Sequence, residues 1–139
     1  MTVDIGDIRE ALASQVGLQL DMPAHPYVIE PTVFPCVVIN VINHDFGESF
    51  GGVDGDMTHQ FQVIALVSRS VDVVEIQKAL DAFVDRGARG VLAAIYEDDT
   101  LGLAGVKAIG PETGSRGTVQ IGQNSYAGVT FHVEINHGA

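Results

Sequence analysis

The chain contains a single cysteine, Cys36, among its 139 residues. One cysteine excludes an intramolecular disulfide framework and any zinc site built from several cysteines. Cys36 follows Pro35 and precedes an apolar run, and no histidine or lysine stands near it in the sequence. We therefore interpret Cys36 as a small buried hydrophobic side chain, ahead of the alternative that it is a reactive thiol.

Positive charge is also scarce. Seven Lys and Arg residues stand against 18 Asp and Glu residues, which gives a formal net charge of −11. The basic residues are scattered singly along the chain, whereas binding to nucleic acid through phosphates requires a basic patch. We therefore expect no sequence-specific binding of DNA or RNA. The simplest interpretation of the acidity is that it favours solubility.

Long apolar runs are missing as well. No run approaches the roughly 18 residues that a membrane-spanning helix needs. The N-terminus carries Asp4 and Asp7, so it is unlike the basic start of a signal peptide. We expect a protein that is cytoplasmic when synthesised and that does not associate with membranes. With 46% apolar and 18% charged residues, the chain is typical of one folded domain covering residues 1–139.

Familiar catalytic motifs do not occur in the chain. The stretch 110–117 is rich in glycine but lacks the Lys-Ser/Thr ending of a phosphate-binding loop, so we interpret it as an ordinary loop. The Asp54 and Asp56 pair has the Asp-x-Asp spacing of a calcium loop, but the other ligand positions are missing. There is no nucleophile elbow, zinc-protease helix or dinucleotide fingerprint. We therefore expect no enzymatic activity and no cofactor.

One histidine cluster remains as an alternative. His44 and Asp45 end one predicted strand and His59 begins the next, so they could meet across the strand pair. Two histidines and a carboxylate can bind a metal or supply a general base, as in a small metal-dependent hydrolase or ligand-binding domain. His59 shares the face of Phe61 and Val63, however, which favours a hydrogen-bonded histidine at a sheet edge.

Periodicity predicts an α+β fold with a mixed, mostly antiparallel sheet of about five strands packed against two or three helices. Residues 37–44 and 57–68 form the first predicted strands. Apolar residues on both faces at Ile64 and Leu66 predict that this end of the second strand is covered on both sides. Shorter strands are predicted for 106–109, 118–121 and 125–136.

Three helices are predicted by stripes of apolar side chains at helical spacing. The first covers 4–16, with Gly17 as its stop, and the second covers 73–84, with Asp72 and Glu75 as a capping box. The apolar stripe is made by Ile5, Ile8, Leu12 and Val16 in the first helix and by Val73, Ile76, Leu80 and Phe83 in the second. A short third helix covers 91–96. The proline-rich stretch 18–35 predicts an irregular traverse with at most short strand pieces.

The strand ending in Ala-Leu-Val-Ser-Arg, the turn after it and the helix Ile-Gln-Lys-Ala-Leu-Asp-Ala-Phe-Val resemble the lambda-like tail terminator family of long-tailed bacteriophages. Residues 91–96, 99–102, 106–110 and the closing hairpin are similar in order and spacing, most strongly from Phe61 onward. The resemblance implies a homohexameric ring in the virion, at the neck of the tail. Such a ring stops tail-tube growth and joins tail to head, with the tail tube protein and a head-closure or connector protein as partners. Another neck protein of that kind is the alternative.

Two groups of residues are candidates for roles in such a ring. Phe46, Phe50 and Val53 are apolar residues in the polar segment 46–56, so this segment is a candidate assembly arm. A negatively charged channel would let DNA slide, and the candidates for its lining are Asp45, Glu48, Asp54, Asp56, Glu97, Asp98 and Asp99. The competing interpretations are that both phenylalanines fold onto their own sheet and that the carboxylates serve solubility alone.

Overall fold

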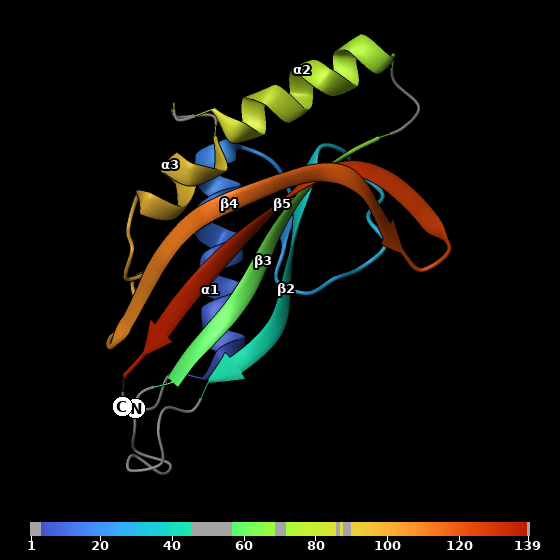
Figure 1. Ribbon diagram of the computed structural model, residues 1–139. Helices are drawn as coiled ribbons and strands as arrows, with labels where there is room; N and C mark the ends of the chain where they lie inside the picture. The colour runs from blue at the N-terminus through green and yellow to red at the C-terminus, as the bar shows by residue number, and fades with distance from the viewer. Residues whose placement is uncertain (1–3, 46–56, 69–71, 86, 88–89, 139) are drawn as a thin grey trace.

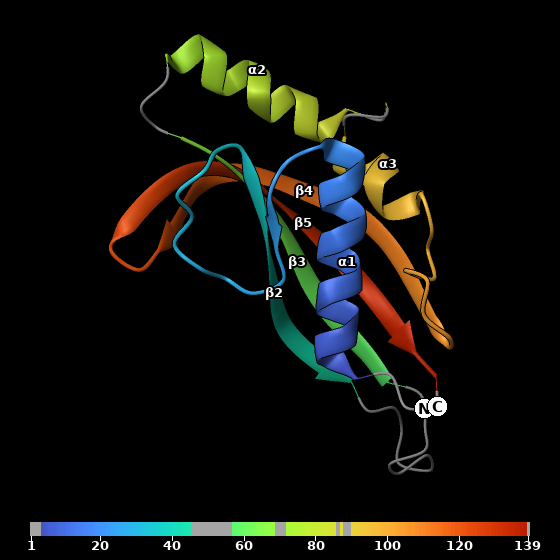
Figure 2. The same ribbon diagram turned by 180° about the vertical axis from the view of Figure 1, so that it is seen from behind.

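The computed structural model describes residues 4–45, 57–68, 72–85, 87 and 90–138. The protein has an α+β fold in which helices cover one face of a five-stranded sheet (Figures 1 and 2). The strands are β1 (Ala24–His25), β2 (Cys36–Asp45), β3 (Met57–Val67), β4 (Val106–Ile121) and β5 (Asn124–His137). The helices are α1 (Ile5–Leu20), α2 (Val73–Val84) and α3 (Val91–Tyr96).

The order of strands in the sheet is β1-β2-β3-β5-β4. Only the short β1 runs parallel to its neighbour β2, and the other three pairings are antiparallel. The predicted mixed, mostly antiparallel sheet with three helices is therefore confirmed. The β4–β5 hairpin turns at Gly122, whose φ of 60° suits the tight two-residue connection between Ile121 and Asn124.

The main core lies between α1 and the sheet. Ile8, Leu12 and Val16 of α1 are fully buried, as the predicted stripe requires, and Ile5 packs at its edge. On the sheet, alternate residues of the paired strands β3 and β5 face the helix, and Val63 lies opposite Phe131 in the register. Each such large side chain contributes about 1.5–3 kcal/mol by its burial.

α1 does not stop at Gly17, so that part of the prediction is wrong. The helix continues to Leu20 and ends at Asp21, whose φ of 53° is left-handed. A Cβ on Gly17 would lie 3.1 Å from the Cβ of Ala24 and 3.2 Å from the carbonyl oxygen of Met22. The glycine therefore serves the close approach of the returning chain, which lies beside the last turn of the helix.

A second, smaller core lies on the other face of the sheet, near the bent end of the β4–β5 hairpin (Figure 1). It consists of Cys36, Val38, Ile64, Leu66 and Ile121, with Phe34, Val119 and Tyr126 packed against them. The rings of Phe34, from the proline-rich traverse, and Tyr126 lie 5.3 Å apart. The prediction that Ile64 and Leu66 are covered on both sides is confirmed.

β4 is much longer than predicted, because residues 110–117 belong to the strand. Residues 113–117 pair with β5, and residues 110–112 lie in an irregularity between Ile109 and Thr113. Pro111 is tolerated because β4 is an edge strand, where an amide on the outer side needs no partner. Gly114 fits under the ring of Phe131, since a Cβ there would lie 3.1 Å from Phe131 Cε1. The interpretation of this stretch as a loop was wrong because β5 supplies its hydrogen bonds.

α2 lies across the end of the sheet with only part of its apolar stripe covered (Figure 1). Asp72 caps the helix by accepting a hydrogen bond from the Val74 amide at 2.9 Å. Leu80 and Phe83 of the predicted apolar stripe are buried, but Val73 at its start is 67% exposed. Among the described residues of this helix, Ile76 packs against the main core, whereas Val73 and Val74 at its start stay largely exposed.

Candidate functional site

Three histidines lie in a row across one end of the sheet, on neighbouring strands. His44 on β2 is directly opposite His59 on β3, and their Nδ1 atoms are 2.9 Å apart. His59 is opposite Ile135 on β5, and the ring of His137, two residues further along β5, has its centroid 6.2 Å from that of His59. The predicted meeting of His44 and His59 across the strand pair is therefore confirmed.

Most of this histidine row is buried. His59 has no exposed surface and His137 is 6% exposed, whereas His44 is exposed at the end of β2. Among the described residues, the Nε2 atom of His59 and the Nδ1 atom of His137 have no hydrogen-bond partner. The expectation that His59 lies at a sheet edge is wrong, because β3 lies inside the sheet between β2 and β5. The expected hydrogen bond is present, to His44, but it satisfies only one of the two ring nitrogens.

One nitrogen of His59 stays unsatisfied whichever of its two nitrogens carries the hydrogen. A neutral imidazole has one N–H donor and one acceptor nitrogen. If His44 donates its Nδ1–H to His59, the buried Nε2–H of His59 has no acceptor. If His59 donates instead, its Nε2 lone pair has no donor. A buried polar atom without a partner costs about 1–3 kcal/mol, so the row lowers the stability of this end of the sheet.

Burial lowers the pKa of His59 below its ordinary value of 6.5, and His44 and His137 lower it further by charge repulsion. His59 is therefore neutral at neutral pH. Its ring also lies edge-on to the ring of Phe61, with centroids 6.2 Å apart. The ring of Phe61 is apolar and supplies no hydrogen-bond acceptor for a charged imidazole.

A metal site does not follow from the row. No group of three or more His, Cys, Asp or Glu side chains in the described part of the chain is arranged to hold a metal ion. His59 offers His44 only its Nδ1 atom, and its other nitrogen lies on the far side of the ring. Asp45 is exposed at the end of β2. The Asp54 and Asp56 pair lies outside the described residues.

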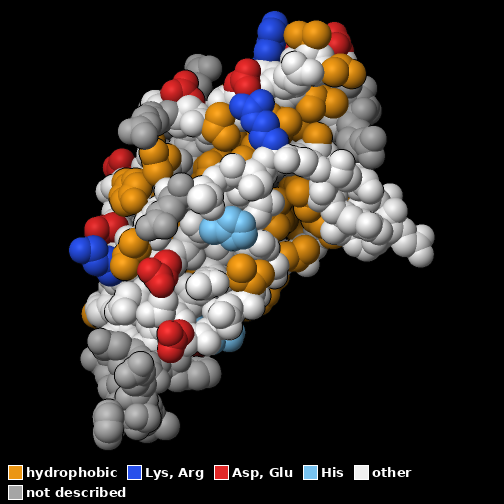
Figure 3. Space-filling view, viewed as in Figure 1, with side chains coloured by type: hydrophobic (Ala, Val, Ile, Leu, Met, Phe, Trp, Pro, Cys, Tyr) orange, Lys and Arg blue, Asp and Glu red, His pale blue; other side chains and the backbone are white. Residues whose placement is uncertain are grey.

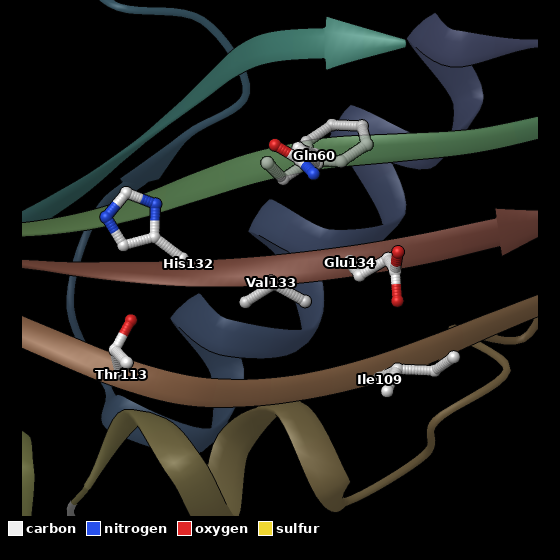
Figure 4. Close-up of a pocket in the computed structure, with 7 residues that line it drawn as sticks. Gln60, Ile109, Thr113, His132, Val133 and Glu134 are labelled. Carbon is white, nitrogen blue, oxygen red and sulfur yellow. The ribbon is translucent and has the colours of Figure 1, made fainter. Parts of the chain in front are cut away.

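A shallow pocket of about 300 Å³ lies on the face of the sheet that no helix covers (Figure 4). His132 and Glu134 of β5 stand between Gln60 of β3 and two residues of β4, Thr113 and Ile109. The irregularity of β4 between Ile109 and Thr113 opens the space beside them. These side chains can donate and accept hydrogen bonds, but the residues that line the pocket include no serine or cysteine nucleophile.

The same face continues as a polar surface beyond the pocket. Asn40 on β2 donates a hydrogen bond to Gln62 on β3 at 3.0 Å. In Figure 3 the centre of this face is mostly white, the colour of uncharged polar side chains and backbone. The alternation within residues 57–68 predicted that Gln60 and Gln62 share a face of their strand. The alternation within residues 125–136 predicted the same for His132 and Glu134. It could not reveal the pocket, because the irregularity in β4 leaves no local signal.

The predicted acidic residues are only partly described. Glu97 and Asp98 are exposed and Asp99 is half-buried, all in the connection between α3 and β4. Asp98 accepts hydrogen bonds from the Thr100 hydroxyl at 2.6 Å and the Thr100 amide, which lower its pKa. The other candidates, Glu48, Asp54 and Asp56, and the assembly-arm residues Phe46, Phe50 and Val53 lie outside the described residues.

Gln15 is a positioning residue that sequence analysis missed. Its Nε2 atom donates to the carbonyl oxygens of Ala94, Ile95 and Asp98, each at 3.0 Å. It thereby satisfies the C-terminal carbonyls of α3 from α1 and fixes the start of the acidic connection. Only the helical period of α1 could have placed Gln15 toward a neighbour, and the identity of that neighbour depends on the tertiary fold.

Two of the scattered basic residues have structural partners. Arg9 on α1 donates to the carbonyl oxygens of Pro26 and Ile39 and stacks on the ring of Tyr27 at 4.6 Å. Arg116 on β4 pairs with Asp81 on α2. These two cations therefore hold elements of this chain together, and they do not form a patch for phosphates.

None of the described helices is long and apolar enough to cross a membrane. Comparison of the sequence with models of known protein families found no family that matches it, and comparison with curated proteins found no match either.

Proposed function

We propose that the protein is a structural component of a phage tail, a homohexameric ring at the head-proximal end that stops tail-tube growth and joins tail to head. Its partners are further copies of itself, the tail tube protein and a head-closure or connector protein. The proposal rests on the resemblance of the sequence to tail terminators. It is supported by the order of elements, in which β3 leads to α2, α3 and the closing β4–β5 hairpin.

The observation that carries the proposal is the uncovered apolar surface of α2. Val73 and Val74 are 67% and 54% exposed at the start of a stripe that Leu80 and Phe83 continue into the core. Apolar side chains reach the surface along this helix in Figure 3. A second exposed group, made by Tyr27, Val28, Ile29 and Val33, lies in the traverse.

Exposed apolar patches of this kind mark protein–protein contacts. A ring needs two different patches on each subunit, because each subunit contacts its two neighbours through different surfaces. The α2 patch and the traverse patch are two such surfaces. Contacts between copies would remove these side chains from water and would complete the stripe that one chain leaves open.

The charge of the chain fits passage of DNA through a ring. Six copies with a net charge of −11 each would carry −66. A negative channel wall would repel phosphates over about 8 Å at physiological ionic strength and would not retain the genome. Among the described residues, Asp45, Glu97 and Asp98 are exposed carboxylates available for such a wall. Solubility alone is the competing explanation of the same charge.

The native mass of the protein tests the ring. We expect a mass near six chains for the wild type and a ring in electron micrographs. Val73→Glu combined with Val74→Glu should give a folded monomer with an unchanged circular dichroism spectrum. Gln77→Glu, which adds a charge at an exposed polar position of the same helix, is the matched control and should keep the ring. A wild-type protein that stays monomeric at micromolar concentration contradicts the proposal.

The candidate assembly arm gives a second test. Shortening residues 47–55 to a tight turn should impair assembly or change tail length while the domain still folds, if Phe46, Phe50 and Val53 contact a neighbouring subunit or the tail tube. Normal assembly and normal tail length in particles carrying the shortened protein would exclude that role for the arm.

Two alternatives remain open to experiment. A head-closure or connector protein would leave tail length unchanged when it is lost, whereas loss of a terminator should give tails of irregular length. A small ligand-binding domain is favoured by the pocket at Gln60, His132 and Glu134. The described residues offer no group of metal ligands to support the metal-dependent hydrolase. Glu134→Ala should leave the hexamer intact if the pocket has no part in assembly.

A further inference from the structure

The histidine row, His44, His59 and His137, gathers three of the five histidines of the chain at one end of the sheet. β2 ends there at Asp45 and β3 begins there at Met57, so the row joins the two strand ends between which the segment 46–56 is inserted. Figure 2 shows that α1 begins at this same end.

The surroundings of His59 oppose a positive charge. The titratable groups that act on its ring are His44 on β2 and His137 on β5. On α1, Asp4 and Asp7 accept hydrogen bonds from each other's backbone amides in the capping box. The charged residues on the neighbouring parts of the strands, Asp45 of β2, Glu134 of β5 and Lys107 of β4, are exposed. None of these carboxylates is hydrogen-bonded to the buried ring in the described structure.

The hydrogen bond between the two rings needs one nitrogen that carries a hydrogen and one that carries a lone pair. When His44 donates its Nδ1–H, the Nδ1 atom of His59 is the acceptor, and a proton added there removes its lone pair. A positive charge on His59 would also be opposed by its burial and by repulsion from His44 and His137.

We propose that the histidine row is a pH-sensitive catch, which holds the ends of β2 and β3 together at neutral pH and releases them on acidification. The catch does not depend on the proposed ring, because all of its parts belong to one chain. On acidification, the pairing between the strand ends would weaken before the pairing at the centre of the sheet. The paired residues at the strand ends are Asn43 with Gln60, His44 with His59 and Asp45 with Thr58.

The direction of the effect follows from proton binding. Since the pKa of His59 is lowered in the closed strand ends, the opened form binds more protons whenever the pH is below about 6.5, the ordinary pKa. The closed form is therefore fully favoured above the ordinary value and loses stability as the pH falls below it. Each unit by which the pKa is lowered allows about a tenfold change in the opening equilibrium.

Amide hydrogen exchange on the full-length protein tests the catch. Protection factors, corrected for the intrinsic effect of pH, are measured at pH 7.5 and pH 5 for residues 43–45 and 57–60. Residues 63–66 of the same strand are the internal reference. We expect protection at the strand ends to fall at pH 5 while the reference changes little. An equal change in both regions, or no change in either, overturns the proposal.

Variants separate the catch from general acid sensitivity. His59→Phe replaces the buried ring with one that cannot take a proton, and it should abolish the pH-dependent loss of protection. His132→Gln changes an exposed histidine on the other face and should leave the loss unchanged. A loss that persists in His59→Phe overturns the proposal. If His59→Phe does not fold, the NMR titration of the His59 ring in the wild type decides, since a midpoint at or above 6.5 also overturns it.

Discussion

Arg116 on the edge strand β4 donates a hydrogen bond to the Asp81 carboxylate of α2 across 2.6 Å. The pair joins a helix with a partly uncovered apolar stripe to a part of β4 that the sequence alone suggested was a loop. Both side chains are well exposed, at 42% and 67%. Solvent therefore screens the attraction, and the pair orients α2 more than it stabilises the fold.

Arg116→Met should lower the free energy of unfolding by only about 0.2–1 kcal/mol, because the ion pair is exposed. The loss should shrink as salt is added, since screening weakens the wild-type pair. Urea denaturation at low and high ionic strength measures both effects. Lys78→Met, which breaks the longer and more exposed 3.6 Å pair with Glu75, is the control and should cost less. A loss above 2 kcal/mol for Arg116→Met would show that the pair does more than orient the helix.

Phe131→Ala should destabilise the protein by about 3–5 kcal/mol, because Phe131 is buried in the main core. The neighbouring His132→Ala should cost less than about 0.5 kcal/mol, because His132 is exposed on the open face. Denaturant unfolding of the two variants provides the comparison. Equal losses would mean that the open face is covered in solution, as at a contact between subunits.

Gly128→Ala and Gly117→Ala form a matched pair, since these two glycines lie opposite each other in the register of β4 and β5. A Cβ on Gly128 would lie 2.7 Å from the carbonyl oxygen of Ala65, so we expect a loss of about 1–3 kcal/mol. A Cβ on Gly117 would meet nothing within 4 Å. That variant should be neutral or gain about 0.4–1 kcal/mol from the stiffer unfolded chain. Thermal unfolding should give a lower midpoint for Gly128→Ala than for Gly117→Ala. The reverse ranking would contradict the close approach of Gly128 to Ala65.

The Cys36 thiol should be inert in the folded protein. Burial raises its pKa to about 11, so only about one thiol in a thousand is ionised at pH 8, and the thiolate is the reactive form. Labelling with a thiol reagent at pH 8 should therefore be slow in the native protein and fast in denaturant. Fast labelling without denaturant would show that Cys36 is reached by solvent without unfolding of the chain.

The strands and helices that the sequence predicted correctly are those with a strong local period. The stripe Ile8, Leu12 and Val16 in α1 and the alternation of Phe61 and Val63 in β3 are both buried as expected. In each case the side chains that share a face follow directly from the repeat of the backbone, which is 3.6 residues in a helix and 2 residues in a strand. The close approach of His44 and His59 also followed, because consecutive antiparallel strands bring their facing ends together.

The features that the sequence predicted wrongly or did not predict depend on residues far apart in the chain. Gly114 and Pro111 read as loop residues until β5 is placed beside β4. Gly114 then pairs with Phe131 and fits under its ring, and Pro111 lies in the irregularity between Ile109 and Thr113. The burial of His59 is decided by β5, which covers the other side of β3 and adds His137 from the end of the chain.

The amino-acid sequence by itself determined the apolar faces of α1 and β3, the acidity and the class of fold, because periodicity and charge are local or additive properties. The tertiary structure alone decided which strand became central, where β4 opens the pocket, and which nitrogens of the histidine row stay without partners. Those outcomes come from strand order and register, which are set by the packing of distant segments against each other. The exposed end of α2 follows the same logic, since only the fold shows that one chain leaves Val73 and Val74 uncovered.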